Sequence, residues 1–217
     1  MGVIKRGILG GVSNKVGNVV GSSWKGIATL RSLPLSVANP NTKAQKDNRT
    51  SFSIMSKLGS DVLATVCQPL WNRDAKQMSG FNAYVMYNKL AFDADPLEWL
   101  INPIMSKGNL SADLLTAELH ADGHSIITTY SSALVNPQDS DDDVAYIQLI
   151  HKDNSDPANP EFHAKAFSFG ALRASGTVMV PKTFDVNTGD KIIVSLSFKS
   201  KDGREVANSS SQIITIA

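Results

Sequence analysis

The chain has 217 residues, of which 42% are hydrophobic and 19% are charged. This is the composition of a globular protein rather than of a disordered one, and the length allows one large domain or two small ones. The longest apolar runs are interrupted by polar residues or proline and are too short to span a bilayer, so we expect no membrane insertion.

The formal net charge is +1, but the charges are unevenly distributed. Residues 1–58 contain nine basic residues and one acidic residue. Residues 59–104 contain three basic and five acidic residues, and residues 105–217 contain nine basic and fourteen acidic residues. A basic front end is therefore joined to an acidic back end. We predict two parts: a docking region of arm, hairpin and helices over residues 1–104, and a separate domain over residues 105–217.

The first predicted element is a β-hairpin in a glycine-punctuated segment. Two short β-prone runs lie around Val19 and Ile27, with a Trp-Lys-Gly turn between them. The chain that follows is expected to be extended, because Pro34 and Pro40 each disfavour the helical conformation in the preceding residue.

A helix is predicted to begin after this extended stretch. Thr42 and Gln45 have the spacing of a capping box, in which each side chain satisfies a free backbone amide of the other. We expect the helix to end at Lys57 or Leu58, with Gly59 as the stop signal. Its apolar side chains form a narrow stripe: Ala44, Phe52, Met55 and Leu58.

Two further helices are predicted over residues 60–70 and 79–90, and a helical turn over residues 95–103. The aromatic residues of the helix over residues 79–90, Phe81 and Tyr84, have helical spacing, which is typical of core packing rather than of a cofactor site. Cys67 lies in an apolar stretch, so we expect a buried, unreactive thiol.

The second half changes to β-prone segments. Several of them show the alternation of a half-buried strand, and their number and spacing are typical of an immunoglobulin-like or fibronectin-like sandwich. The seven segments are residues 114–121, 124–131, 144–152, 162–169, 176–182, 191–200 and 205–216. The predicted class is α+β: a hairpin arm and a small helical region, followed by a seven-stranded immunoglobulin-like β-sandwich.

Two groups of residues are candidates for metal binding. His120 and His124 flank Asp122 at a predicted turn and have the side chains for a transition metal, but no recognisable ligand pattern surrounds them, so we favour ordinary histidines. The acidic run before residue 144 is a weak calcium candidate; because it lacks the order of an EF-hand loop, we favour a solvated loop. Its members are Asp139, Asp141, Asp142 and Asp143.

Three stretches resemble a known family. These are residues 14–26 (NKVGNVVGSSWKG), residues 38–45 (ANPNTKAQ) and residues 79–82 (SGFN). They are similar to an uncharacterised family of small proteins of unknown function from Bacteroidetes bacteria and their phages. The resemblance covers roughly the first ninety residues, and it implies a phage- or prophage-type component without implying any chemistry.

These observations favour a non-enzymatic structural protein of a phage particle or similar assembly. No catalytic triad, metal constellation or phosphate loop is recognisable, so we predict no catalytic residue and no cofactor. The partners would be copies of the chain or other structural proteins, and the location would be a virion or the cytoplasm, because no signal peptide is recognised. The expected assembly contacts are Val19, Val20, Trp24, Ile27 and Arg31.

The alternative hypothesis is a nucleic-acid-binding module. Basic side chains of the front end would then contact phosphates, together with Arg31. These phosphate contacts would be Lys5, Arg6, Lys15, Lys25, Lys43, Lys46 and Arg49.

Overall fold

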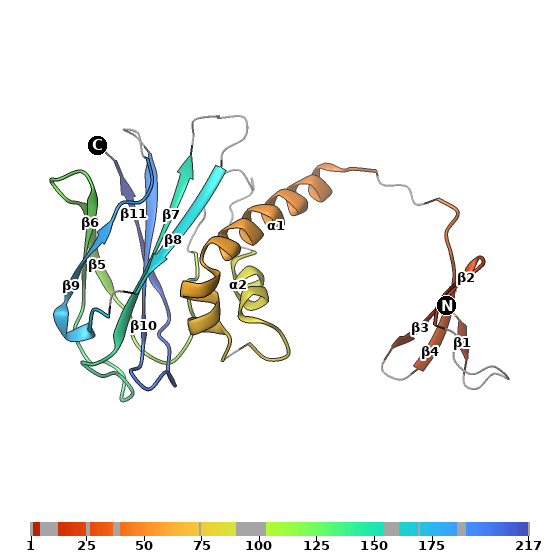
Figure 1. The fold of residues 1–217 in the computed structure, drawn as a ribbon, viewed down its shortest axis with the longest axis horizontal. Helices are drawn as coiled ribbons and strands as arrows, with labels where there is room; N and C mark the ends of the chain where they lie inside the picture. Colours follow the sequence, from red (N-terminus) through yellow and green to blue (C-terminus); the bar gives the residue numbers. More distant parts are fainter. Residues whose placement is uncertain are drawn as a thin grey trace. The chain divides into compact units, whose positions relative to one another are not determined.

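Figure 1 shows the fold in a computed structural model of the chain. The chain divides into two compact units, Met1–Thr42 and Lys43–Ala217, which we call the N-terminal unit and the C-terminal unit. The structure describes residues 2–4, 13–24, 27–36, 40–73, 75–89, 103–153, 161–168, 170–185 and 190–216.

The N-terminal unit is a four-stranded antiparallel sheet with the strand order β1-β4-β3-β2. Its strands are β1 (Gly2–Ile4), β2 (Asn14–Val16), β3 (Val19–Trp24) and β4 (Ile27–Ser32). The predicted hairpin is confirmed as the β3–β4 pair, although its turn at residues 25–26 lies outside the described residues. The prediction of an isolated hairpin is wrong, because β1 and β2 pair with the free edges of β4 and β3.

Three helices begin the C-terminal unit in the described part of the chain. They are α1 (Lys43–Asp61), the π-helix η1 (Leu63–Trp71) and α2 (Gly80–Asn88). Helix α1 begins directly after Thr42, as predicted, and the Ser79 hydroxyl caps α2 by accepting a hydrogen bond from the Asn82 amide at 3.3 Å. None of the described helices is long and apolar enough to cross a membrane. The helical turn predicted over residues 95–103 falls almost wholly outside the described residues.

Gly59 does not end α1, contrary to the prediction, because the helix continues to Asp61. A Cβ atom at Gly59 would lie 2.9 Å from Cε2 of Phe81, so the glycine allows α1 to approach α2 closely. Burial along α1 is limited to its C-terminal half. Met55 and Leu58 are buried, whereas Ala44 is exposed and Phe52 is 61% exposed, so the predicted apolar stripe is only half covered.

Seven strands follow, and each of the seven predicted β-prone segments overlaps one of them. They are β5 (Leu114–Leu119), β6 (Ser125–Tyr130), β7 (Val144–Asp153), β8 (Glu161–Phe167), β9 (Thr177–Pro181), β10 (Lys191–Lys199) and β11 (Ser210–Thr215). The described chain has more strands than the predicted hairpin and seven-stranded sandwich together, because the N-terminal sheet also contains β1 and β2.

These strands form two antiparallel sheets, ordered β5-β6-β9 and β11-β10-β7-β8. Side chains of both sheets meet in one hydrophobic core, which includes Ile126 and Val180 from the first sheet and Leu149 and Leu196 from the second. The protein is therefore an α+β protein with three antiparallel sheets among its described residues.

The helices cover the other face of the sheet β11-β10-β7-β8, as Figure 1 shows. Successive strand residues point to opposite faces, so Leu149 enters the core between the sheets while Ile150 packs with Trp71 and Tyr84 of the helices. The Gln148 amide also donates to the Tyr84 hydroxyl at 2.9 Å. The helical region thus shares a core with the strands, whereas the sequence placed a boundary between residues 104 and 105.

Candidate functional site

The two faces of the sheet of the N-terminal unit differ in charge, because the described cations of its strands, Lys15 and Arg31, share one face. Cross-strand partners and alternate residues of a strand share a face. Val19, Gly21 and Ser23 point to one face of β3. Their cross-strand partners on the same face are Val16 opposite Val19, Leu30 opposite Gly21, and Ala28 opposite Ser23. We call the surface formed by Val16, Val19, Ala28 and Leu30 the apolar face.

The apolar face has no layer over it in the described part of this unit. Val16 is 61% exposed and Val19 is 38% exposed, while Ala28 and Leu30 are half-buried. Among the described residues, the first buried core side chain along the chain is Met55, which belongs to the C-terminal unit. A sheet is stable when its apolar face packs against a second layer, so this face is suited to contact another molecule.

The opposite face carries the basic residues of the sheet. Lys15 pairs with Val20 and Val20 pairs with Arg31, so the two cations flank one valine across three strands. On the same face, the hydroxyl groups of Ser22 and Thr29 are hydrogen-bonded at 2.9 Å. We call Lys15, Val20 and Arg31 the basic row.

The predicted assembly contacts are thus divided between the two faces. Val19 lies on the apolar face, whereas Val20, Ile27 and Arg31 lie on the face of the basic row. The backbone of Trp24 pairs with that of Ile27, and the Trp24 side chain is outside the described part of the structure.

Sequence reasoning missed Val16, Ala28 and Leu30. Val16-Gly17-Asn18-Val19 carries a usable signal, since Gly-Asn between β-prone residues is typical of a two-residue hairpin turn. The structure has this turn, with Gly17 at a φ of 59°. Once β2 is recognised, alternation along β3 and β4 places the apolar side chains on one face.

Among the described residues, the predicted phosphate contacts lie in two places, on the N-terminal sheet and on α1. Lys15 belongs to the basic row, while Lys43, Lys46 and Arg49 are exposed in the first half of α1. Residues three apart are neighbours on a helix surface, so these three cations lie along one side of α1. The others lie outside the described residues: Lys5, Arg6 and Lys25.

The acidic run is an internal ion-pair network rather than a solvated loop. Asp139 and Asp143 are buried beside Arg173, whose Nη2 lies 3.4 Å from Oδ1 of Asp139 and 3.1 Å from Oδ2 of Asp143. The solvated-loop prediction holds only for the exposed Asp141 and Asp142, and Asp142 pairs with Lys201 at 3.0 Å.

Burial by itself would raise the pKa of Asp139, but several donors outweigh it. Hydrogen bonds from Ser111 and from the Asn136 amide, together with the charge of Arg173, hold this pKa below its ordinary value. Both oxygens of the Asp139 carboxylate already accept hydrogen bonds within the network, and calcium would have to displace these donors.

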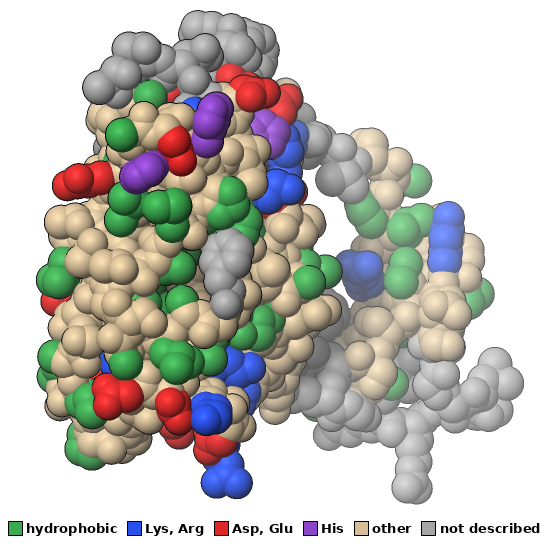
Figure 2. Space-filling view, turned by 60° about the vertical axis from the view of Figure 1, so that its left-hand side comes forward, with side chains coloured by type: hydrophobic (Ala, Val, Ile, Leu, Met, Phe, Trp, Pro, Cys, Tyr) green, Lys and Arg blue, Asp and Glu red, His purple; other side chains and the backbone are tan. Residues whose placement is uncertain are grey.

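The side chains of three histidines, His120, His151 and His163, each lie beside one carboxylate. His120 Nδ1 lies 3.1 Å from Oδ2 of Asp122, and the His124 amide donates to Asp122. This hydrogen bond, together with those from His120 and Ser125, lowers the pKa of Asp122 to about 2. His151 is buried with its Nε2 3.2 Å from Oδ2 of Asp190. Figure 2 shows histidines near carboxylates at one end of the C-terminal unit. Among the described residues, no group of three or more histidine, cysteine or acidic side chains is arranged to hold a metal ion.

Cys67 is buried, as predicted, and burial raises the pKa of its thiol to about 12. The thiolate that reacts as a nucleophile is therefore scarce at neutral pH.

No curated protein and no solved structure matches the chain. A family model does match: DUF6266, a family of unknown function, aligns with residues 11–212. The matched stretch runs from the N-terminal sheet into β11, so it includes most of both units. The chain therefore belongs to the family DUF6266.

Proposed function

We propose that this protein is a non-enzymatic structural component of an assembly such as a phage particle. The N-terminal unit docks onto neighbouring subunits, in the first place copies of the same chain, and the C-terminal unit is displayed or packed outside. The observation that carries this proposal is the apolar face of Val16, Val19, Ala28 and Leu30, over which the described part of the N-terminal unit places no second layer.

A second copy of the chain is a suitable cover for this face. Two sheets that pack face to face lie about 10 Å apart and form a core from their inner side chains. Two apolar faces brought together in this way would bury Val16 and Val19, which are exposed in the single chain. Docking would thus supply the second layer that the N-terminal sheet needs.

For the C-terminal unit we infer an immunoglobulin-like sandwich. With β5 to β11 taken as strands A to G, one sheet holds A, B and E, and the other holds G, F, C and D. Immunoglobulin constant domains place A, B, E and D against C, F and G. The difference is confined to the fourth strand, β8, which pairs with β7 instead of joining the first sheet. Such sandwiches serve as display and adhesion domains, which suits an outward position.

Two substitutions on neighbouring residues of β3 test the docking proposal. Val19→Asp places a charge on the apolar face, whereas Val20→Asp places the same charge on the opposite face and carries the same cost in strand propensity. Sedimentation of the purified full-length chain should show concentration-dependent oligomers for the wild type and for Val20→Asp. For Val19→Asp the dissociation constant of the oligomer should rise at least about tenfold, so that monomer predominates. A wild-type chain that stays monomeric at all concentrations, or equal effects of both variants, would refute self-docking.

The basic row supports nucleic-acid binding as a second candidate function. Lys15 and Arg31 lie on one face of the sheet, and the first half of α1 adds exposed cations. Binding of this kind would weaken steeply as salt rises, because phosphate contacts release condensed counterions. If Lys15→Glu with Arg31→Glu abolishes DNA binding by the full-length chain at physiological salt while Val19→Asp leaves it intact, the basic row is the functional surface.

A further inference from the structure

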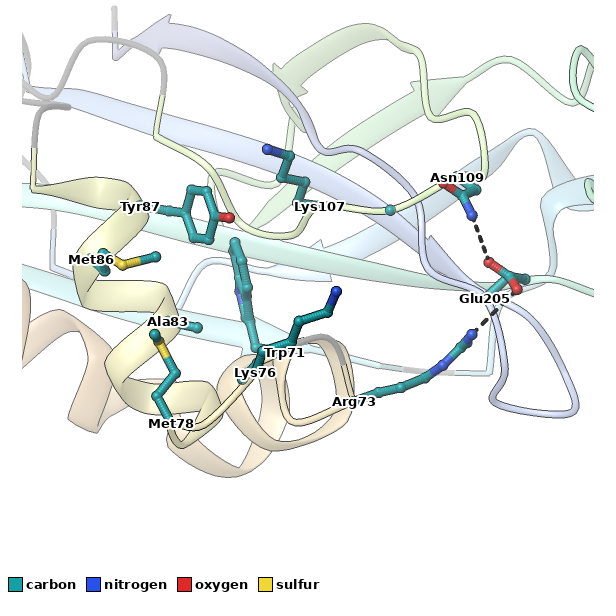
Figure 3. Close-up of a pocket in the computed structure, with 12 residues that line it drawn as sticks. Trp71, Arg73, Lys76, Met78, Ala83, Met86, Tyr87, Lys107, Asn109 and Glu205 are labelled. Carbon is teal, nitrogen blue, oxygen red and sulfur yellow. Dashed lines mark hydrogen bonds and ion pairs between the residues drawn. The ribbon is translucent and has the colours of Figure 1, made fainter. Parts of the chain in front are cut away.

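A pocket of about 460 Å³ opens in the C-terminal unit, to which all of its lining residues belong. Figure 3 shows that its walls come from segments far apart in the sequence: the end of η1 and the turn after it, helix α2, and two stretches of chain next to β5 and β11. A volume of this size falls in the range of pockets that hold a ligand or an anchoring side chain.

Two aromatic rings form the floor of the pocket. The rings of Trp71 and Tyr87 are stacked, with centroids 5.1 Å apart and planes inclined by 26°. The Trp71 indole N–H donates to the Met105 carbonyl at 2.7 Å, which fixes the ring, and Trp71 is only 2% exposed. Tyr87 is 39% exposed, so its ring, held against the buried Trp71, presents an apolar surface that loses little conformational entropy on binding.

Two methionines give the pocket an adaptable wall. Met78 is 40% exposed in the turn before α2, and Met86 is 50% exposed on α2 itself. Methionine side chains are flexible and polarizable, and they recur at surfaces that accommodate partner side chains of varied shape.

The rim of the pocket is cationic. Its described lining includes Arg73, Lys76 and Lys107 but only one carboxylate, that of Glu205. This carboxylate is already engaged by Arg73 and by Asn109, each at 3.3 Å.

The two lysines of the rim remain available to an incoming anion. The Lys107 ammonium lies 4.9 Å from the centroid of the Tyr87 ring, and neither Lys76 nor Lys107 forms an ion pair within the described residues. The contrast with the surroundings is large, because residues 43–217 as a whole contain sixteen basic and twenty acidic residues. An occupant that complements this rim carries negative charge.

We propose that this pocket binds an acidic peptide segment of a partner protein, with one aromatic or aliphatic side chain against Tyr87, Met78 and Met86 and carboxylates against Lys76 and Lys107. A peptide is favoured over a free small molecule by the composition of the lining. Tryptophan, tyrosine, methionine and arginine are the residues enriched in the centres of protein–protein interfaces, and all four line this pocket. The site shares no residue with the N-terminal sheet, so this proposal does not depend on the self-docking proposal.

Selection from a displayed library of random peptides about twelve residues long tests this proposal on the full-length chain. We expect enriched sequences that combine acidic residues with an aromatic or large aliphatic residue. Titration of an enriched peptide should change the fluorescence or NMR signals of Trp71. Lys76→Glu with Lys107→Glu should weaken binding at least about tenfold, which corresponds to 1.4 kcal/mol.

Two controls make the outcome decisive. Lys191→Glu reverses an exposed charge outside the pocket and should leave binding unchanged. Phenylacetate, which joins one aromatic ring to one carboxylate, should bind at least about tenfold more weakly than the peptide. The proposal is overturned if no acidic sequence is enriched, if the double reversal binds the peptide as tightly as wild type, or if phenylacetate binds as tightly as the peptide.

Discussion

The Arg173 guanidinium and the Asp143 carboxylate form an ion pair inside the C-terminal unit, 3.1 Å apart and with both side chains 1% exposed. Arg173 also lies over the ring of Phe198, 4.2 Å from its centroid, and donates to the Ser111 carbonyl at 2.9 Å. One buried cation thereby ties the acidic loop before β7 to the core strand β10 and to the chain before β5.

Substitution of Arg173 by methionine should destabilise the protein strongly. The methionine fills a similar volume but leaves Asp139 and Asp143 buried without their cation, a situation that costs about 3–5 kcal/mol. Lys201→Met is the matched control, because it breaks the exposed pair with Asp142 and should cost at most about 1 kcal/mol. Urea unfolding of both variants measures the difference, and equal losses would contradict the role of the buried network.

The stability of the protein should fall in acid partly through Asp139. Its pKa in the folded state is lowered, so its contribution is complete above the ordinary aspartate pKa of about 3.9 and is lost as pH falls through the folded value. Asp139→Asn should therefore flatten the pH dependence of the free energy of unfolding below about pH 4. Asp141→Asn, on an exposed neighbour, should leave that dependence as steep as in the wild type.

Calcium should leave the melting temperature unchanged. Both oxygens of Asp139 accept hydrogen bonds and Oδ2 of Asp143 pairs with Arg173, which leaves only Oδ1 of Asp143 without a hydrogen-bond partner among these buried carboxylate oxygens, whereas calcium takes about six to eight oxygen ligands. A site occupied at a hundred times its dissociation constant would add about 2.7 kcal/mol, which a thermal melt detects readily. A clear upward shift with calcium, absent with magnesium, would restore the metal hypothesis for this loop.

The fragment of residues 105–217 should fold poorly by itself, whereas residues 43–217 should unfold in one cooperative transition. Removal of the helices uncovers Ile150, Phe162 and Ile193, which pack against them in the intact unit. We expect the shorter fragment to aggregate or to lose most of its stability, as measured by size-exclusion chromatography and urea unfolding. A shorter fragment as stable as the longer one would show that the strands need no helical layer.

Local signals were sufficient to predict most of the elements. Runs of β-prone residues, most of them alternating, located the strands from β5 to β11, and the start of α1 after Thr42 follows from its capping sequence. The three-residue strands β1 and β2 were missed because so few residues show no alternation. The π-helical turns of η1 carry no pattern that distinguishes them from an α-helix.

Long-range pairings could not be predicted from one sequence. Asp143 meets Arg173 thirty positions away, and no local feature marks these two charges as partners. Strand β10 did carry a signal: its residues are apolar or small almost throughout, and its burial on both faces, as in the middle of β7, places one layer on each side. This burial on both faces indicates that the helices and the strands belong to one unit.

Crosslinking through Val19 tests the central claim most directly. Val19→Cys and Val20→Cys place a thiol on the apolar face and on the opposite face of the same strand, and the buried Cys67 leaves the background unreactive. With a short bismaleimide, the full-length Val19→Cys chain should give a covalent dimer in high yield at micromolar concentration, and Val20→Cys should stay monomeric. Dimer formation by Val20→Cys alone, by both variants equally or by neither would contradict docking through the apolar face.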